Sequence, residues 1–420
     1  MDKKNYILSI TILGALFFIF GFVTWLNGTL IPFLKISCEL NNFQAYFVTF
    51  AFYISYFVMA IPSSKLLHIT GFKKGMSVGL AVMAIGSLVF IPAALTRTFE
   101  LFLTGLFLQG TGLAVLQTAS NPYITILGPM RSAARRISIM GICNKVAGII
   151  SPLVLGAIVL KGANDIVEKL KTIEGIEHQQ LLDSLANRVI MPYIVMAIVL
   201  VFLAILVLYS GLPDIDTDQG ETNVENDSSE KNSIFQFPHL LLGFLAIFLY
   251  VGVEVMAGDT IVLYGQSQGI SLEISRTFTS YTLVAMVIGY IIGIFAIPKL
   301  ISQEKALTIS AALGIIFSLI AIFTTGTTSV FFIAVLGLAN AVMWPAIWPL
   351  ALEGLGKFTK IGSALLIMGI AGGATLPLIY GRLADVINNQ KAYWIMVPAY
   401  LFLLFFATIG HKIRIKKVIK

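Results

Sequence analysis

A short stretch of the chain places polar side chains inside an apolar run. Residues 110–129 (GTGLAVLQTASNPYITILGP) carry Gln117 and Asn121 four positions apart, followed by Pro122. Residues four apart lie on one helical face, and amides both donate and accept hydrogen bonds, which suits a polyhydroxylated ligand. Inside a membrane such groups need water, a substrate or a neighbouring helix. Gln117 and Asn121 are candidate substrate-binding residues, and hydrogen bonding between helices is the alternative.

Three charged residues also lie deep within apolar runs, away from the ends of those runs. Glu254 and Asp259 belong to the run 237–265, and Lys145 to the run 135–160. A helix starting near residue 238 rises about 1.5 Å per residue, which places Glu254 about 24 Å along it and Asp259 about 31 Å, near the outer rim. The two carboxylates would project about 140° apart. Charges inside a membrane mark function by default, so these three residues are candidates for ion coupling. The alternatives are an outer-end charge in water for Asp259 and snorkelling towards the cytoplasm for Lys145; in the functional interpretation Lys145 pairs with a carboxylate until a ligand or ion binds.

An aromatic and amide pattern occurs in a later run. Asn340, Trp344 and Trp348 are spaced four apart, hence on one helical face. An aromatic ring can stack on the apolar face of a ring-shaped polyol while amides bind its hydroxyls. Asn340 and Trp344 are therefore candidate substrate contacts, and simple packing of the tryptophans is equally compatible with the pattern.

The composition predicts that membrane helices position these residues. The chain has 420 residues, of which 57% are hydrophobic and 12% charged, with a mean hydropathy of +0.90. A soluble protein would carry about 25% charged residues. Apolar runs long enough to cross a bilayer number six before a polar segment and six after it. They lie at about 6–34, 43–66, 75–95, 99–127, 135–160, 189–211, 237–265, 277–298, 305–325, 328–352, 359–384 and 391–411.

The order of these runs predicts two six-helix halves. Residues 1–211 form the first half and residues 237–420 the second, joined by a polar cytoplasmic linker at 212–236. The string AGIISPLVLGAIV (147–159) repeats as GGATLPLIYGRLA (372–384), with matching Gly, Pro, Leu and Gly. This repeat favours a duplicated, pseudo-symmetric unit. The fold class is all-α and integral to the membrane, with twelve transmembrane helices.

The basic residues predict the orientation. Most of the 28 Lys and Arg fall in segments that are cytoplasmic if the N-terminus is inside, which also places the C-terminus inside and the 161–188 segment outside. The net charge of +7 follows from this rule and predicts no nucleic-acid partner. Cys38 and Cys143 suggest neither a disulfide nor a metal site.

Four strings resemble one family. FFIFGFVTWLNGTLIPFLK (17–35), FAFYISYFVMAIPSSKLL (50–67), LQTASNPYITILGP (116–129) and FLYVGVEVMAGDT (248–260) are similar to the fucose/hexose permease branch of the major facilitator superfamily, especially its glucose/galactose-type members. The resemblance implies the major facilitator fold, alternating access and sugar uptake coupled to an ion. It also implies that Asn27 and Asn144 bind the substrate, because both occupy positions that are polar in the family. Three residues before Asn144, however, this chain has Gly141 where the family usually has a glutamine.

The chain departs from the family at its carboxylates. Fucose-type members carry one after the asparagine of the first helix and one in the fourth helix, where this chain has Gly28 and Gln117. Gln117 favours a hexose-like substrate. When the seventh span is laid over the first, Asp259 falls on Gly28, so we hypothesise that the seventh helix supplies the missing carboxylate.

These observations predict a bacterial inner-membrane transporter that imports a neutral hexose or N-acetylhexosamine by ion-coupled symport. The alternatives are a facilitative uniporter, a drug or metabolite exporter on the same fold, and a sugar sensor. We expect a monomer in the lipid bilayer, with no cofactor beyond a coupling proton or sodium ion. No Walker loop, HExxH motif or nucleophile elbow occurs, so an enzyme is not expected.

Overall fold

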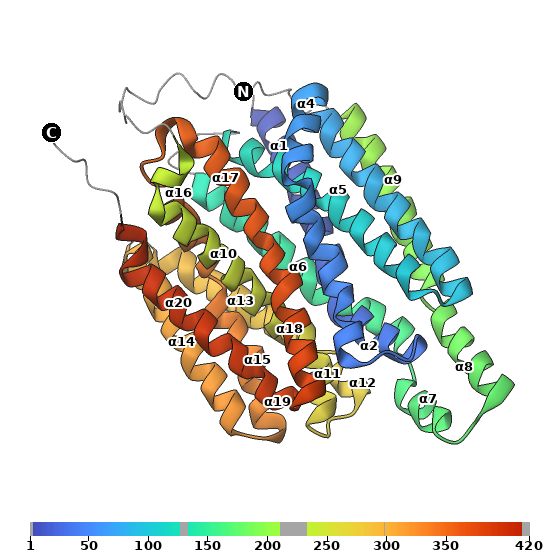
Figure 1. Cartoon of the computed structure of the whole chain (residues 1–420). Coiled ribbons are helices and arrows are strands. Elements are labelled where there is room, and N and C mark those ends of the chain that lie inside the picture. The colour runs from blue at the N-terminus through green and yellow to red at the C-terminus, as the bar shows by residue number, and fades with distance from the viewer. Residues whose placement is uncertain (1–2, 127–132, 211–232, 298, 414–420) are drawn as a thin grey trace.

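The computed structural model describes residues 3–126, 133–210, 233–297 and 299–413, and Figure 1 shows them as a bundle of helices. In the described part of the first half the helices are α1 (Lys3–Thr24), α2 (Asn27–Ser37), α3 (Asn42–Ala45), α4 (Phe47–Thr96), α5 (Phe99–Ile126), α6 (Ala133–Val159), α7 (Ala163–Leu170), α8 (Gly175–Asn187) and α9 (Ile190–Tyr209).

The described part of the second half begins with a 3-10 turn, η3 (Ile234–Gln236), and contains a π-helical segment, η4 (Met256–Thr260). Its α-helices are α10 (Pro238–Val255), α11 (Ile261–Ser267), α12 (Leu272–Ser275), α13 (Phe278–Ala296), α14 (Gln303–Phe323), α15 (Gly326–Asn340), α16 (Met343–Leu352), α17 (Thr359–Met368), α18 (Gly372–Val386), α19 (Asn389–Ala392) and α20 (Met396–Thr408). Further 3-10 turns are η5 (Gly356–Phe358), η6 (Gly369–Ala371), η7 (Tyr393–Ile395) and η8 (Gly410–Lys412).

The number of membrane crossings follows from helix length. Among the described residues, eleven helical stretches are long and apolar enough to span a membrane, and one of them, Asn42–Thr96, has 55 residues. A straight helix of that length would reach about 80 Å, far beyond an apolar core of about 30 Å. Gly71 interrupts it with φ 75° and ψ 169°, a conformation that glycine adopts readily. This stretch therefore holds two crossings, and the prediction of twelve transmembrane helices is confirmed.

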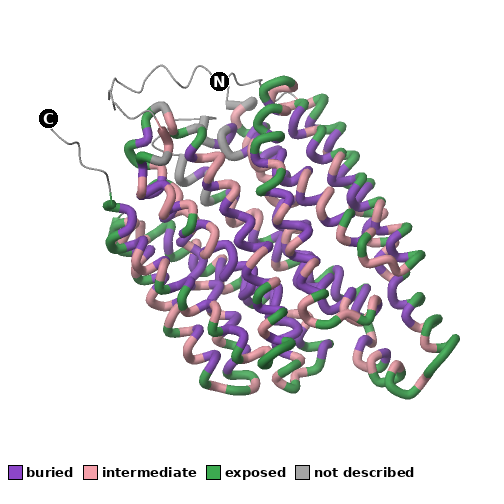
Figure 2. Tube along the Cα trace, viewed as in Figure 1, coloured by how far each residue is buried: buried purple, intermediate pink, exposed green. Residues whose placement is uncertain are grey.

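The bundle has two distinct ends (Figure 1). Helix α1 begins and η8 ends at one of them, which we call the terminal face. Helices α7, α8, α12 and α19 lie at the opposite end, which we call the loop face. Figure 2 shows buried residues concentrated between the helices and exposed residues along the outside. Large apolar side chains such as Phe202 and Phe323 are exposed there, as a surface that contacts lipid requires.

The two halves are joined by hydrogen bonds at the loop face. The Asp385 carboxylate in α18 accepts from the backbone N–H of Asn42 at 3.2 Å and of Phe43 at 2.8 Å, and from the Asn42 side-chain amide at 2.7 Å. On another side of the bundle, Arg276 donates to the carbonyl of Gly156 at 2.8 Å. The carboxylate of Asp385 thus accepts from backbone N–H groups at the start of α3, and the guanidinium of Arg276 donates to a carbonyl in the last turn of α6. Both charges are of the sign that stabilises the helix end they contact. These contacts hold the loop face closed.

The seventh crossing is not a continuous α-helix. It runs from α10 through η4 into α11, and a π-helical turn leaves backbone carbonyls without their usual α-helical partners. Two threonines of the adjacent α13 donate to these carbonyls: Thr279 to Gly258 at 2.7 Å and Thr282 to Ala257 at 3.2 Å. Such compensation allows an irregular turn to persist inside a membrane-spanning helix.

Candidate functional site

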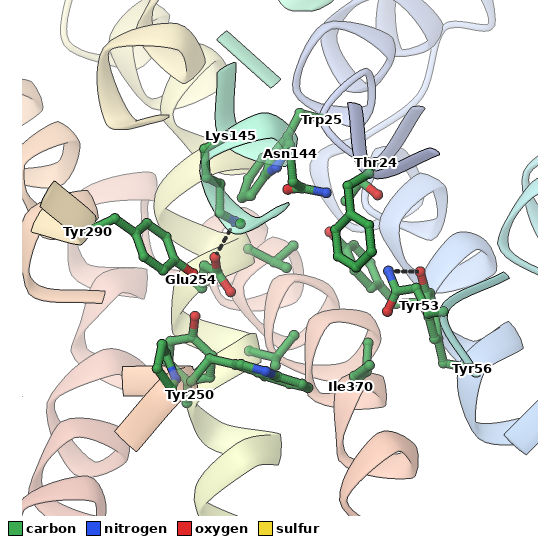
Figure 3. A pocket seen from close by; sticks show the side chains of 17 residues that line it. Thr24, Trp25, Tyr53, Tyr56, Asn144, Lys145, Tyr250, Glu254, Tyr290 and Ile370 are labelled. Carbon is green, nitrogen blue, oxygen red and sulfur yellow. Dashed lines mark hydrogen bonds and ion pairs between the residues drawn. The ribbon is translucent and has the colours of Figure 1, made fainter. Parts of the chain in front are cut away.

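A cavity of about 180 Å³ lies between the two halves. Helices α1, α4, α5 and α6 line it from the first half, and α10, α13, α16 and η6 from the second. Its lining combines aromatic rings, amides and one ion pair, as Figure 3 shows from close by. A concave site with an apolar wall and a few convergent polar groups is the usual form of a small-molecule site.

The ion pair bridges the halves at the cavity. The Lys145 ammonium in α6 lies 2.7 Å from a carboxylate oxygen of Glu254 in α10, and each side chain is 10% exposed. Lys145 also lies 4.5 Å from the centre of the Trp25 ring, within the range of a cation–π interaction. Figure 3 shows the two charged groups pointing toward each other. The Lys145 ammonium therefore ends at a carboxylate instead of extending to the cytoplasmic surface.

Two predicted amides line the cavity. The Gln117 amide in α5 donates to the Tyr56 hydroxyl at 3.1 Å, which fixes its orientation and leaves its oxygen free to accept. Asn144, which precedes Lys145 in α6, also lines the cavity and is half-buried. Asn121 belongs to α5, but its side chain lies outside the described part of the structure.

Aromatic rings form much of the wall. Trp344 in α16 lines the cavity and stacks on Trp348, with ring centres 5.3 Å apart. The Tyr250 ring lies 6.4 Å from Trp344. Three tyrosines that no sequence pattern singled out also line the cavity: Tyr53, Tyr56 and Tyr290. Aromatic residues on apolar helices resemble packing residues, so only the polar hydroxyl of each tyrosine could have indicated a role.

Three other predicted residues do not line this cavity. Asn340, at the end of α15, is fully buried and accepts a hydrogen bond from the Tyr400 hydroxyl at 2.9 Å. Asn27, the first residue of α2, is fully buried, and its side-chain amide has no hydrogen-bond partner among the described residues. Asp259 is fully buried within η4. All three side chains are buried in the interior of the bundle, outside the lining of the cavity.

The structure corrects two expectations about Asp259. The helical stretch of the seventh crossing continues to Ser267, so Asp259 lies about 12 Å from the end of that stretch, at about 1.5 Å per residue. It is also 0% exposed, which contradicts an outer-end charge in water. The angle of 140° to Glu254 assumed an unbroken α-helix, and the π-helical segment between them breaks that periodicity.

Gly28 lies beside Thr279, which supports the π-helical segment that contains Asp259. A Cβ added at Gly28 would lie 2.5 Å from the Thr279 hydroxyl oxygen, which itself donates to the carbonyl of Gly258. A side chain at position 28 would therefore displace the contact that supports the residue preceding Asp259. The space that a carboxylate on the first crossing would need is occupied by α13.

The chain is similar to known proteins over nearly its whole length. The family model of the Major Facilitator Superfamily matches residues 13–373. A glucose/galactose transporter of Brucella abortus is 35% identical, covering 98% of this chain and 96% of that protein. An L-fucose-proton symporter of Escherichia coli is 27% identical, covering 96% of this chain and 93% of that protein. The crystal structure of FucP in the outward conformation covers 97% of this chain and 99% of its own, at 26% identity and a TM-score of 0.73. The chain belongs to the major facilitator superfamily.

Proposed function

We propose that this chain is a secondary active transporter that imports a neutral hexose of the glucose/galactose type, or an N-acetylhexosamine, by ion-coupled symport. The proposal is carried by the cavity between the halves. Rings such as Trp344 and Tyr250 suit the apolar face of a sugar, while Gln117 and Asn144 suit its hydroxyls. The glucose/galactose transporters among its relatives support the substrate class.

The position of the cavity supports alternating access. In this fold a substrate binds midway between the two halves, which rock about it. The hydrogen bonds of Asp385 and Arg276 close the loop face, so a change to the opposite state has to break them. The Lys145–Glu254 pair also joins the halves, directly at the cavity. We propose that sugar binding weakens this pair.

Coupling to an ion is supported by relatives named L-fucose-proton symporters. Glu254 and Asp259 are the carboxylates within the seventh crossing. We place the chain as a monomer in the bacterial inner membrane, with the terminal face in the cytoplasm according to the distribution of basic residues. The halves are residues 1–211 and 237–420, joined by a cytoplasmic linker at 212–236.

Exchange of labelled sugar in proteoliposomes tests the substrate class without any ion gradient. We expect preloaded glucose or galactose to drive counterflow of the labelled sugar, with fucose and N-acetylglucosamine as comparisons. Trp344→Ala should lower the exchange at subsaturating sugar. Trp394→Ala is the matched control, because Trp394 is 45% exposed and lies outside the cavity lining.

The alternatives predict different results. Exchange without accumulation in any ion gradient would indicate a facilitative uniporter. Exchange of none of the four sugars, together with binding of apolar compounds, would contradict the proposal and favour an exporter. Equal effects of the two tryptophan variants would contradict the assignment of the cavity as the sugar site.

A further inference from the structure

We propose that Asp259 is the group that binds the transported proton, at a site separate from the sugar cavity. The inference rests on the proposed symport function and assigns the coupling ion and its carrier. Asp259 is 0% exposed, does not line the cavity, and neither carboxylate oxygen has a hydrogen-bond partner among the described residues.

The energetics of burial favour the protonated form. An isolated ionised carboxylate is far costlier to bury in an apolar environment than a neutral carboxyl, so a buried group without a partner neutralises instead. A neutral carboxyl with unmade hydrogen bonds loses only the smaller desolvation free energy of its polar atoms. The burial of Asp259 without a partner among the described residues therefore favours the form that carries a proton.

In the described part of the chain, the ionisable groups that interact with Asp259 offer it no counter-charge. Three ionisable groups lie close enough to interact with Asp259 electrostatically: Tyr46, Tyr53 and Glu254. Each of them is neutral when protonated and negatively charged when ionised, so none can carry a positive charge. The Lys145 ammonium lies 2.7 Å from Glu254 and forms an ion pair with it. Glu254 is thus compensated by a partner, and Asp259 is left to be neutralised by a proton.

The local backbone isolates this carboxyl. Asp259 lies in the π-helical segment, and such turns occur frequently at functional sites. The Thr260 hydroxyl next to it donates to the Met256 carbonyl at 2.7 Å and contacts the Tyr393 hydroxyl at 2.6 Å. Thr260 is therefore held by these two contacts, and neither Asp259 oxygen has a hydroxyl within hydrogen-bond distance among the described residues. This arrangement disfavours sodium, because that ion would need several oxygen ligands in addition to the carboxylate.

A layer of tyrosines leads from this segment to the loop face. The Tyr393 ring lies 4.7 Å from Tyr380, and Tyr380 lies 5.5 Å from Tyr46. Tyr46 follows α3, whose first residues are held by Asp385. When these contacts open, water can reach Asp259 from the loop face, and the carboxylate takes up one proton. Closure buries the neutral acid, and hydration from the other side releases the same proton.

Infrared spectroscopy and proton uptake together test this assignment. In purified wild-type protein at neutral pH we expect the carbonyl stretch of a protonated carboxyl, and Asp259→Asn should remove it. In lightly buffered proteoliposomes, addition of sugar should cause proton uptake by the wild type. Asp259→Asn should lose that uptake and all accumulation, while counterflow of labelled sugar continues and shows that the variant is folded.

The matched control is Glu273→Gln, which alters an exposed acid of α12 at the loop face. It should keep both the infrared band and proton uptake. Sugar-dependent proton uptake by Asp259→Asn, accumulation driven by sodium alone, or the absence of a protonated carboxyl band in the wild type would each overturn the inference. These outcomes differ from failure of the proposed function, in which the wild type exchanges no sugar.

Discussion

The Lys145–Glu254 pair illustrates how single residues connect substrate and conformation. It is the contact at which the cavity wall and the interface between the halves coincide, since Lys145 belongs to α6 and Glu254 to α10. Both groups are mostly removed from solvent. A buried pair gives little net stability compared with apolar residues, but removal of one partner leaves an uncompensated charge.

We therefore predict non-additive effects on stability. Lys145→Gln and Glu254→Gln should each lower the thermal unfolding temperature of the purified protein, by a free-energy loss of up to about 3–5 kcal/mol. The double variant should be more stable than at least one of the single variants. Thermal unfolding of all four proteins measures the coupling. Strictly additive losses would show that the pair does not act as a unit.

Two asparagines allow a second prediction, because one lines the cavity and the other does not. Asn144→Ala should weaken sugar binding about fivefold, equivalent to about 1 kcal/mol for one hydrogen bond, with little change in stability. Asn340→Ala removes the acceptor of the buried Tyr400 hydroxyl, so it should cost about 1–3 kcal/mol of stability.

Sugar titration and thermal unfolding, measured on both variants, separate the two roles. The Asn340 variant should keep its sugar affinity at temperatures where it is folded. The reverse pattern, with affinity lost in Asn340→Ala and kept in Asn144→Ala, would contradict the position assigned to the sugar.

At the scale of elements, the loop-face contacts govern access to the cavity. Asp385 receives three hydrogen bonds from the first two residues of α3, and a glycine one turn earlier permits close approach: a Cβ at Gly381 would lie 2.4 Å from the Tyr46 ring. Helix α18 thus packs directly on the segment that precedes α4. Loss of the carboxylate should loosen this closure while leaving each half intact.

We predict that Asp385→Ala shifts the protein towards an open loop face. Spin labels at the exposed positions 180 and 273, in a background with Cys38 and Cys143 replaced by serine, report the distance between α8 and α12. The distance distribution should move to longer values in Asp385→Ala. Asp183→Ala is the control, since Asp183 pairs with Arg97 at 2.6 Å within the first half. An unchanged distribution in Asp385→Ala would mean that other contacts maintain the closure.

For the whole molecule, much of the fold can be predicted from the sequence. Apolar runs separated by polar loops determine the crossings. Even the continuous stretch Asn42–Thr96 divides at Gly71, which lies in the gap between the predicted runs 43–66 and 75–95. Most of the bundle therefore follows from local composition. The predicted linker at 212–236 falls mainly outside the described residues and stays a prediction.

The site was less predictable, because it depends on how helices rotate and where they end. Gln117, Asn144, Trp344 and the pair of Lys145 with Glu254 do line one cavity, whereas Asn27 and Asn340 face other parts of the interior. Helical periodicity relates residues within one helix but does not say which face meets the cavity. No sequence pattern predicted the π-helical turn that contains Asp259. The burial of the Asp259 side chain and its direction relative to Glu254 could therefore be determined only from the structure.

Accumulation of labelled glucose or galactose in proteoliposomes with an imposed inward proton gradient tests proton-coupled import most directly. We predict that wild-type protein concentrates the sugar above its external level, and that dissipation of the proton gradient returns it to equilibrium. A sodium gradient alone should not drive accumulation. Equilibration of the sugar without accumulation, despite a maintained proton gradient, would contradict proton-coupled import.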